Sequence, residues 1–273
     1  MRDIEKPFYI GNNRAMISLG PLTEKIYCPY NCTFCYVKSG FEKYMKLDLD
    51  EIVNYLIQNK NKYNIVYISG DTDSFAPPRT KQAIELIKKI SKNINVDIMF
   101  TTRTVFNDED LTLLKSINDN MNNKLIASIS ISRLYSSSFL EPYPIPTPEA
   151  RIEMLRKLRE NKIYTILAVR PFLPIIKSKE YIEIIERCKE YVDAVLGEIW
   201  YADQNLINAV CKEYDIRNVK FTYKTMDFDN NNKIWKCFEA KEIVDDVTRF
   251  CNENRIPFYM RSYPAIEYIR SKY

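Results

Sequence analysis

Three of the seven cysteines in this chain lie within eight residues, in the stretch YCPYNCTFCY. Cys28, Cys32 and Cys35 have C-x3-C-x2-C spacing, which lets three thiolates face one centre from a single loop. Thiolates are soft ligands that suit zinc or an iron–sulfur cluster. Structural zinc needs four ligands, so a distant cysteine would have to complete it, whereas three cysteines on a four-iron cluster leave one iron open. An open position is typical of a catalytic metal centre.

The chain contains no histidine. This excludes histidine-based zinc sites, the Ser-His-Asp triad and the usual acid–base catalyst at neutral pH. Any chemistry must therefore use thiols, carboxylates, tyrosines, amines or a cofactor. The four remaining cysteines are scattered, and each is expected to be a small buried apolar residue. They are Cys188, Cys211, Cys237 and Cys251.

The net charge of +4 is mild, and basic residues are interleaved with acidic ones. Binding of duplex nucleic acid is therefore not expected. No apolar run approaches the roughly 20 residues of a membrane span, so no membrane association is expected. The first residues, MRDIEKPFYIGNN, lack the apolar core of a signal peptide. We therefore expect a cytoplasmic protein, in which clustered thiols stay reduced and indicate metal binding or catalysis.

The elements that must position the cysteines alternate between strand and helix. Short β-branched runs predict strands over 64–69, 96–101, 124–131, 163–169 and 191–197. Apolar residues at helical spacing predict helices over 48–58, 80–90, 108–117, 147–161 and 179–189. With one more strand just before Cys28, about six βα units precede residue 200. We expect a partial (β/α)6 TIM-like barrel, with a flat doubly wound sheet as the alternative.

After Trp200 the alternation loosens. Helices are predicted over 203–214 and 241–254, and short strands over 218–223 and 256–260. No Gly-, Ser- or Pro-rich linker precedes this part. Residues 201–273 are therefore predicted to form an α/β extension packed on a barrel of residues 1–200.

Polar segments follow the predicted strands. Ligands of parallel α/β sheets sit at the carboxyl ends of the strands, so these segments are expected to meet at one end of the barrel. They are YCPYNCTFCY, SGDTDSFAPP, TTRTVFND, SRLYSSSFLEP and RPFLP.

The cysteine spacing, with the aromatic Phe34 directly before Cys35, resembles the radical S-adenosylmethionine (radical SAM) superfamily. The resemblance implies a [4Fe-4S] cluster on Cys28, Cys32 and Cys35, with SAM chelating the open iron. It also implies reductive cleavage of SAM to a 5′-deoxyadenosyl radical that abstracts hydrogen from a substrate. An electron donor such as flavodoxin or ferredoxin would supply the reducing electron.

Over residues 16 to 200, the order and spacing of these segments resemble the spore photoproduct lyase-like branch of that superfamily. The branch usually has a lysine near the SAM carboxylate where this chain has Arg103, which keeps the positive charge. Phe34 is implied beside the adenine, with Tyr36 as a neighbouring shield. The further cofactor contacts that the resemblance implies are Thr72, Asp73, Ser128, Ser130, Ser132, Glu141 and Arg170.

Each of these residues also has a structural interpretation. Thr72 and Asp73 could cap the next helix, Arg103 could lie on the surface, and Glu141 could be an ordinary loop residue. Arg170 could be a salt-bridge partner rather than a ligand clamp. Alternation along a strand places Ser128, Ser130 and Ser132 on one face.

The substrate is not identified by these motifs. Spore photoproduct lyase repairs a DNA lesion with a cysteine beside the barrel as hydrogen donor, but this chain has no cysteine between Cys35 and Cys188. We therefore expect a small-molecule, nucleoside or peptide substrate. A nucleotide-lesion lyase and a non-enzymatic zinc or Fe–S protein remain the alternatives.

Overall fold

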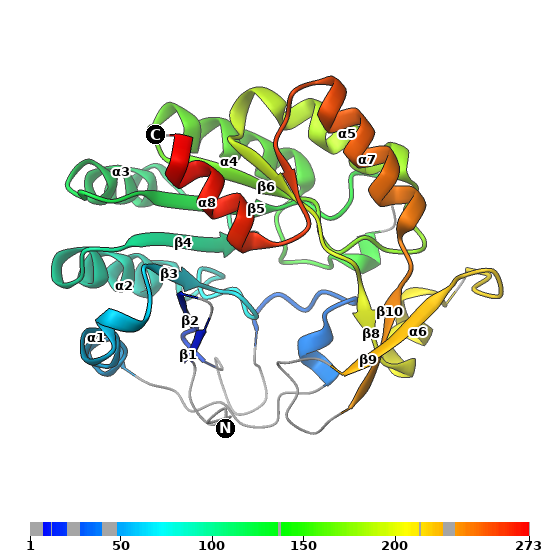
Figure 1. Cartoon of the computed structure of the whole chain (residues 1–273), viewed down its shortest axis with the longest axis horizontal. Helices are drawn as coiled ribbons and strands as arrows, with labels where there is room; N and C mark the ends of the chain where they lie inside the picture. Colours follow the sequence, from blue (N-terminus) through cyan, green and yellow to red (C-terminus); the bar gives the residue numbers. More distant parts are fainter. Residues whose placement is uncertain are drawn as a thin grey trace.

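An eight-stranded sheet organises the fold (Figure 1). The structure is a computed structural model, and it describes residues 8–11, 13–20, 28–39, 48–135, 138–212, 214–225 and 233–272. β1 pairs antiparallel with β2, and every later neighbour in the sheet is parallel. In order across the sheet, the strands are β1 (Phe8–Gly11), β2 (Arg14–Ile17), β3 (Ile65–Ile68), β4 (Asp97–Thr102), β5 (Leu125–Ser130), β6 (Tyr164–Ala168), β7 (Ala194–Leu196) and β11 (Phe258–Tyr259).

Helices connect the successive parallel strands, as expected for a partial barrel. They are α1 (Leu49–Gln58), α2 (Thr80–Asn93), α3 (Asp108–Asp119), α4 (Pro148–Glu160) and α5 (Ser178–Cys188), with α7 (Lys241–Glu253) before β11. No pairing among the described residues joins β1 to β11, so the barrel is not closed there. The predicted partial TIM-like barrel is thereby confirmed. The strand expected just before Cys28 falls on residues outside the described ones, and β2 is the first parallel strand.

Local sequence sets the helix starts. Asp48 and Glu51 form a reciprocal capping box at the start of α1. The side chain of Asn107 accepts a hydrogen bond from the backbone N–H of Asp110 at the start of α3. Thr147 caps α4, and Pro148 occupies its first turn, where a missing N–H costs nothing.

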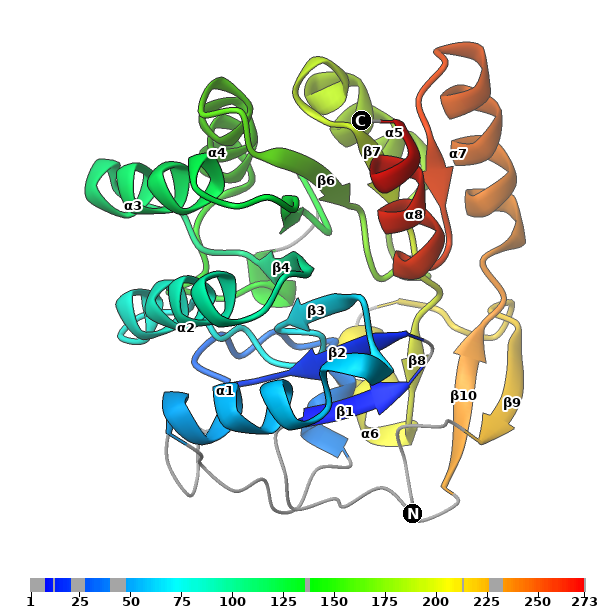
Figure 2. The same cartoon turned by 60° about the vertical axis from the view of Figure 1, so that its left-hand side comes forward.

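The inner face of the sheet contacts α8 (Ser262–Lys272), a helix that sequence analysis did not predict. Tyr67, Met99, Ile126 and Ile166 pack against it, whereas the alternate residues of the same strands face the outer helices. Since successive side chains of a strand point to opposite faces, one strand serves both layers. Figure 2 shows α8 apart from the row of outer helices α1 to α4.

Polar contacts tie α8 to the amino ends of the strands. Arg14 Nη1 donates to Ser262 Oγ at 2.7 Å, and Lys124 Nζ donates to the carbonyl oxygens of Ile269 and Arg270 at 2.9 Å each. Arg270 Nε also pairs with Asp97 Oδ2 at 2.6 Å. Asp97 begins β4 and Lys124 precedes β5, so these polar contacts hold the last turns of α8 at the amino ends of the central strands.

A second, antiparallel sheet follows β7. Its order is β8 (Tyr201–Ala202), β10 (Ile234–Phe238) and β9 (Phe221–Thr225), and α6 (Gln204–Val210) follows β8. The predicted helix over 203–214 is thus shorter than expected, and β8 and β10 were not predicted. β11, expected in the extension, joins the main sheet as a seventh parallel strand. The boundary near residue 200 stays a prediction. None of the helices in the described part of the chain has the length and apolarity that a membrane-crossing segment requires.

Candidate functional site

The cysteine loop, residues 28–35, is held from two sides. Cys32 is buried, and Cys28 and Cys35 are half-buried. On one side, the backbone N–H of Thr33 donates to the carbonyl oxygen of Leu140 at 3.0 Å. On the other, Trp200 Nε1 donates to the carbonyl oxygen of Phe34 at 3.0 Å. The loop that follows β5 and the start of the small sheet therefore fix the position of the thiols.

Hydrogen-bond donors point at the first sulfur. The backbone N–H of Asp73 lies 3.5 Å from Cys28 Sγ, and the Thr72 hydroxyl also hydrogen-bonds this thiol. Burial and the Asp73 carboxylate raise the pKa of Cys28, while these two donors oppose the rise. Burial likewise raises the pKa of Cys32 to about 12, against the opposing charge of Arg103. Donors directed at sulfur are a means by which proteins tune iron–sulfur centres.

The donor set fits an iron–sulfur cluster. Three thiols lie on one short loop, and a bound metal would stabilise the thiolates that burial disfavours. Among the residues that the structure describes, no three Cys, Asp or Glu side chains surround one metal-ion position. The other four cysteines are buried, as predicted.

Asp73 ties the loop after β3 to the end of β4. Its carboxylate accepts hydrogen bonds from Thr102 Oγ1 at 2.9 Å, from the backbone N–H of Arg103 at 2.7 Å and from that of Phe75 at 3.0 Å. α2 begins at Thr80 with Arg79 as its N-cap, so Thr72 and Asp73 do not cap that helix. Both residues instead hydrogen-bond the Cys28 thiol, Asp73 through its backbone N–H and Thr72 through its side chain.

Arg103 lies over the cysteine loop. Its guanidinium carbon is 5.6 Å from the centre of the Phe34 ring, and its side chain is only 17% exposed. Nε donates to Glu141 Oε1 at 2.8 Å, and Nη2 donates to Ser132 Oγ at 3.2 Å. Nη1 makes no hydrogen bond to a described residue. Arg103 is thus a fixed side chain with one unused donor group beside the thiols, rather than a surface residue.

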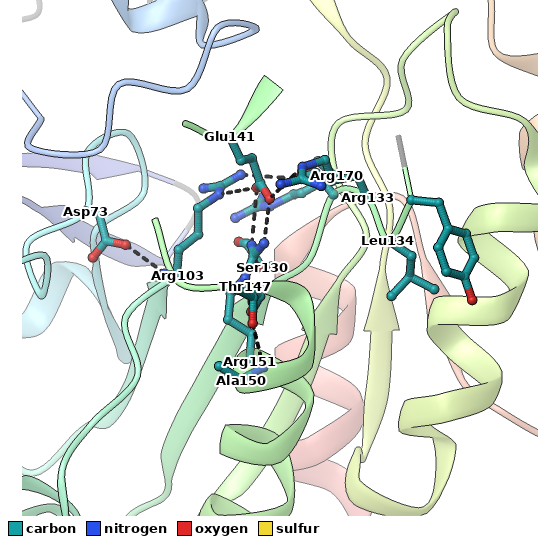
Figure 3. Close-up of polar contacts among 12 residues, drawn as sticks. Asp73, Arg103, Ser130, Arg133, Leu134, Glu141, Thr147, Ala150, Arg151 and Arg170 are labelled. Carbon is teal, nitrogen blue, oxygen red and sulfur yellow. Dashed lines mark hydrogen bonds and ion pairs between the residues drawn. The ribbon is translucent and has the colours of Figure 1, made fainter. Parts of the chain in front are cut away.

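Arg103 is held by a buried ion cluster around Glu141 (Figure 3). Arg151, which is fully buried on α4, donates to both Glu141 oxygens at 3.2 and 2.5 Å and to the carbonyl oxygen of Ser130 at 2.6 Å. Arg133 Nε lies 3.9 Å from Glu141 Oε2. Burial would raise the pKa of Glu141, but the guanidinium groups of Arg151 and Arg103 lower it to about 2. The carboxylate therefore stays ionised at neutral pH among three arginines.

The three serines take different places. Ser128 Oγ is buried and has no hydrogen-bond partner among the described residues. Ser130 is buried, and only its carbonyl group enters the ion cluster. Ser132 Oγ accepts from Arg103 and donates to the carbonyl oxygen of Arg170 at 2.6 Å.

Arg170 belongs to a second polar group, at the ends of β6 and β7. Its Nη2 donates to Tyr67 Oη at 2.8 Å, and Nη1 lies 3.5 Å from Glu198 Oε2. Tyr67 Oη is also 2.9 Å from Thr101 Oγ1. Tyr201 Oη donates to Glu198 Oε1 at 2.5 Å, and its ring packs edge-on against Tyr36 at 5.2 Å. Tyr36 thereby links this group to the cysteine loop.

Several residues of the site were not predicted. They are Arg151, Arg133, Tyr67, Thr101, Glu198 and Tyr201. For Arg151 the sequence held a signal, because helical periodicity places it on the same buried face as Met154, Leu155 and Leu158.

A family model described as the radical SAM superfamily matches residues 26–188. The matched region runs from the cysteine loop to the end of α5. The chain belongs to the radical SAM superfamily. Members of this superfamily use a [4Fe-4S] cluster and SAM, which agrees with the ligands expected from the cysteine spacing.

Curated relatives are similar over part of their length. An uncharacterized protein of Acidianus two-tailed virus is 28% identical over 198 residues, which are 63% of this chain and 64% of that protein. An uncharacterized protein of Methanocaldococcus jannaschii is 27% identical over 176 residues, 59% of this chain and 63% of that protein. A radical SAM Nα-GlyT isomerase of Pseudomonas phage M6 is 28% identical over 174 residues, 59% of this chain and 35% of that protein. The chain therefore spans less than two thirds of each relative.

Solved structures share the fold at low sequence identity. The radical SAM methyltransferase TsrM of Kitasatospora setae, crystallised with tryptophan and a SAM analogue, is 12% identical with a TM-score of 0.58, covering 87% of this chain and 51% of that chain. A radical SAM methyltransferase of Sphaerobacter thermophilus is 13% identical with a TM-score of 0.54, covering 93% and 68%. These likenesses support the partial-barrel architecture.

Proposed function

We propose that this protein is a radical SAM enzyme whose Cys28, Cys32 and Cys35 hold a [4Fe-4S] cluster with one iron open to SAM. The observation that carries the proposal is the cysteine loop, held between the loop after β5 and Trp200 in a chain of this superfamily. When bound and reduced, the cluster supplies the electron that cleaves SAM to a 5′-deoxyadenosyl radical, which takes a hydrogen atom from the substrate.

The residues around the cysteine loop are proposed to have different roles. Thr72 and the backbone N–H of Asp73 donate to Cys28 and set the electrostatics at that sulfur. Phe34 is buried and Tyr36 half-buried, so both keep water from the loop, with Phe34 beside the adenine. The inner-face serines, Ser128 and Ser130, line the floor of the SAM site.

Arg103 is proposed to bind the SAM carboxylate. Its guanidinium lies over Phe34 and retains Nη1 for a ligand, because Glu141 and Ser132 occupy its other nitrogens. Glu141 acts as a positioning residue through Arg103, and Arg151 fixes Glu141 in turn. A charge-assisted hydrogen bond from a pre-oriented guanidinium loses little entropy when the carboxylate arrives.

Within the superfamily, we propose membership of the spore photoproduct lyase-like branch, supported by the order of the motifs over residues 16 to 200. We propose a cytoplasmic location, a flavodoxin- or ferredoxin-like electron donor, and a small-molecule, nucleoside or peptide substrate. The similarity to a phage protein named as an Nα-GlyT isomerase supports isomerisation as the first reaction type to test.

Anaerobic reconstitution tests the proposed function. We expect about four irons per chain, and formation of 5′-deoxyadenosine when the protein is reduced with dithionite in the presence of SAM. Stoichiometric zinc in the anaerobically purified protein, with no SAM cleavage after iron and sulfide are supplied, would contradict the proposal and favour a structural metal site.

A further inference from the structure

Arg170 and Glu198 form an oppositely charged pair that follows the carboxyl ends of β6 and β7. Their closest approach is 3.5 Å, from Nη1 to Oε2, which is long for a charge-assisted hydrogen bond. The Arg170 side chain is 15% exposed and that of Glu198 is 35% exposed. By contrast, the Arg151–Glu141 pair is fully buried and makes contact at 2.5 Å. The two charges of the first pair therefore neutralise one another only in part.

Neutral hydroxyl groups hold both charged side chains in place. Tyr67 accepts from Arg170, and Tyr201 donates to Glu198. Tyrosines orient the guanidinium and the carboxylate without cancelling their charges. Arg170 has five N–H donors and uses two of its nitrogens on described residues, so donors remain for a ligand.

The pair adjoins the cysteine loop. Tyr36, the residue after Cys35, packs edge-on against Tyr201, whose hydroxyl donates to Glu198. Ser128, a buried hydroxyl with no partner among the described residues, lies beside Thr101 in the β4–β5 register. Thr101 in turn contacts Tyr67, which holds Arg170. α8 packs on the inner face of the sheet, and we place the ligand at the carboxyl ends of the strands, where the cysteine loop lies.

We propose that Arg170 and Glu198 bind the carboxylate and the ammonium of an α-amino-acid group on the substrate. This assignment names the substrate class of the proposed radical SAM function and rests on it. A phosphate is a poorer match, because the Glu198 carboxylate would repel it. A neutral ligand would leave two partly desolvated charges without stronger partners. A zwitterion satisfies both charges at once.

SAM carries the same group in its methionyl end, so two sources of this chemistry must be separated. Arg103 already offers a donor for the SAM carboxylate over the cysteine loop, whereas Arg170 lies in the separate group at β6 and β7. We therefore assign the amino-acid group bound by Arg170 and Glu198 to the substrate rather than to SAM.

The test uses the reconstituted protein with saturating SAM under anaerobic conditions. The standard L-amino acids are screened at millimolar concentration by ligand-observed NMR, and each binder is compared with its N-acetyl and its carboxamide derivative. We expect at least one amino acid to bind, and blocking either end to weaken binding about tenfold or more. Arg170→Gln should remove the preference for a free carboxylate, and Glu198→Gln the preference for a free amine.

Arg156→Gln is the matched control, because it removes an equally charged side chain from the exposed surface of α4. The proposal is overturned if no amino acid binds the wild-type protein, if blocked derivatives bind as well, or if both site variants behave as the control. The screen is repeated without SAM, and amino-acid binding that is seen only in its absence would assign the group to SAM instead. Iron content and slow 5′-deoxyadenosine formation, measured on the same samples, report separately on the proposed function.

Discussion

Two arginines at the carboxyl end of the sheet are held in contrasting ways. Arg103, after β4, is fixed by the buried Glu141, which Arg151 anchors from α4. Arg170, after β6, is fixed by a tyrosine hydroxyl and faces a half-exposed glutamate at 3.5 Å. The first arrangement is closed and pre-oriented, as suits a constant cofactor. The second leaves the charges of Arg170 and Glu198 only partly paired. This suits the binding of a substrate, because substrates differ between enzymes of one superfamily.

The largest expected effect concerns the cysteine loop, because the functions proposed for both arginines require a bound cluster. Cys32→Ala should abolish cluster binding, because it removes one of the three cysteine ligands of the proposed cluster. Iron content and the visible absorbance of the reconstituted protein measure this. Cys188→Ala, a buried cysteine of α5, is the control and should keep about four irons. A full, SAM-competent cluster in Cys32→Ala would refute the ligand assignment.

The closed and open clusters should differ in stability. Glu141→Gln leaves Arg151 and Arg103 buried without their carboxylate, which should lower the free energy of unfolding by about 3–5 kcal/mol. Glu198→Gln, in the half-exposed pair, should cost at most about 1 kcal/mol. Urea denaturation of the cluster-free protein measures both changes. Equal costs for the two variants would remove the distinction between the clusters.

Ligand affinity should separate the two arginines. Arg103→Gln should weaken SAM binding about 10- to 100-fold with iron content unchanged, since a charged hydrogen bond is lost. Arg170→Gln should leave SAM affinity close to that of the wild type. Anaerobic calorimetry on reconstituted protein measures both affinities. A similar loss for the two variants would place Arg170 in the SAM site.

The contribution of Glu141 should depend on pH. Its pKa is about 2 in the folded protein, below the ordinary value of 4.5, so the ionised form stabilises the fold fully above about pH 4.5. That stability should be lost as the pH falls from about 4.5 toward about 2. The difference in unfolding free energy between wild type and Glu141→Gln should therefore be constant from pH 8 to 5 and shrink below. A constant difference down to pH 3 would contradict the shifted pKa.

The smallest effect is expected from Tyr67→Phe. The change removes the hydroxyl that Arg170 and Thr101 share but keeps the ring against α8. Losing one hydrogen bond of about 1 kcal/mol should weaken amino-acid binding about fivefold without changing SAM affinity. The screen that tests Arg170 measures this as well. An unchanged amino-acid affinity would show that Tyr67 does not orient Arg170.

The sequence was sufficient for the elements with a clear period. Alternating strands and amphipathic helices predicted β3 to β7 and α1 to α5, because their local pattern agrees with their tertiary burial. α8 was not predicted, since Pro264 reads as a helix breaker, yet it lies in the first turn, where proline is tolerated. β8 has only two residues and exists through its pairing with β10, which no local pattern encodes.

Within the site, the motifs predicted which residues gather and missed how they are held. Asp73, Arg103 and Glu141 were expected near SAM, and the structure connects all three by hydrogen bonds or ion pairs. Arg151 was missed because the many charged residues of α4 suggest a solvated helix face, whereas its position on the apolar stripe of that helix buries it. Glu198 follows a short strand without a recognisable motif, so only the folded chain reveals its pairing with Arg170.

The position of α8 has a consequence for how the chain acquires its fold. Its contact with Arg14 joins residues 248 positions apart, and its contacts with Lys124 join residues 145 and 146 apart. Contacts of such long range form late, because closing large loops costs entropy before the contacts repay it. On the ribosome, the inner face of the sheet would remain uncovered until the sequence after residue 262 emerges. We expect the apolar side chains of β3 to β6 to be exposed during that interval, a condition under which nascent chains are prone to aggregate.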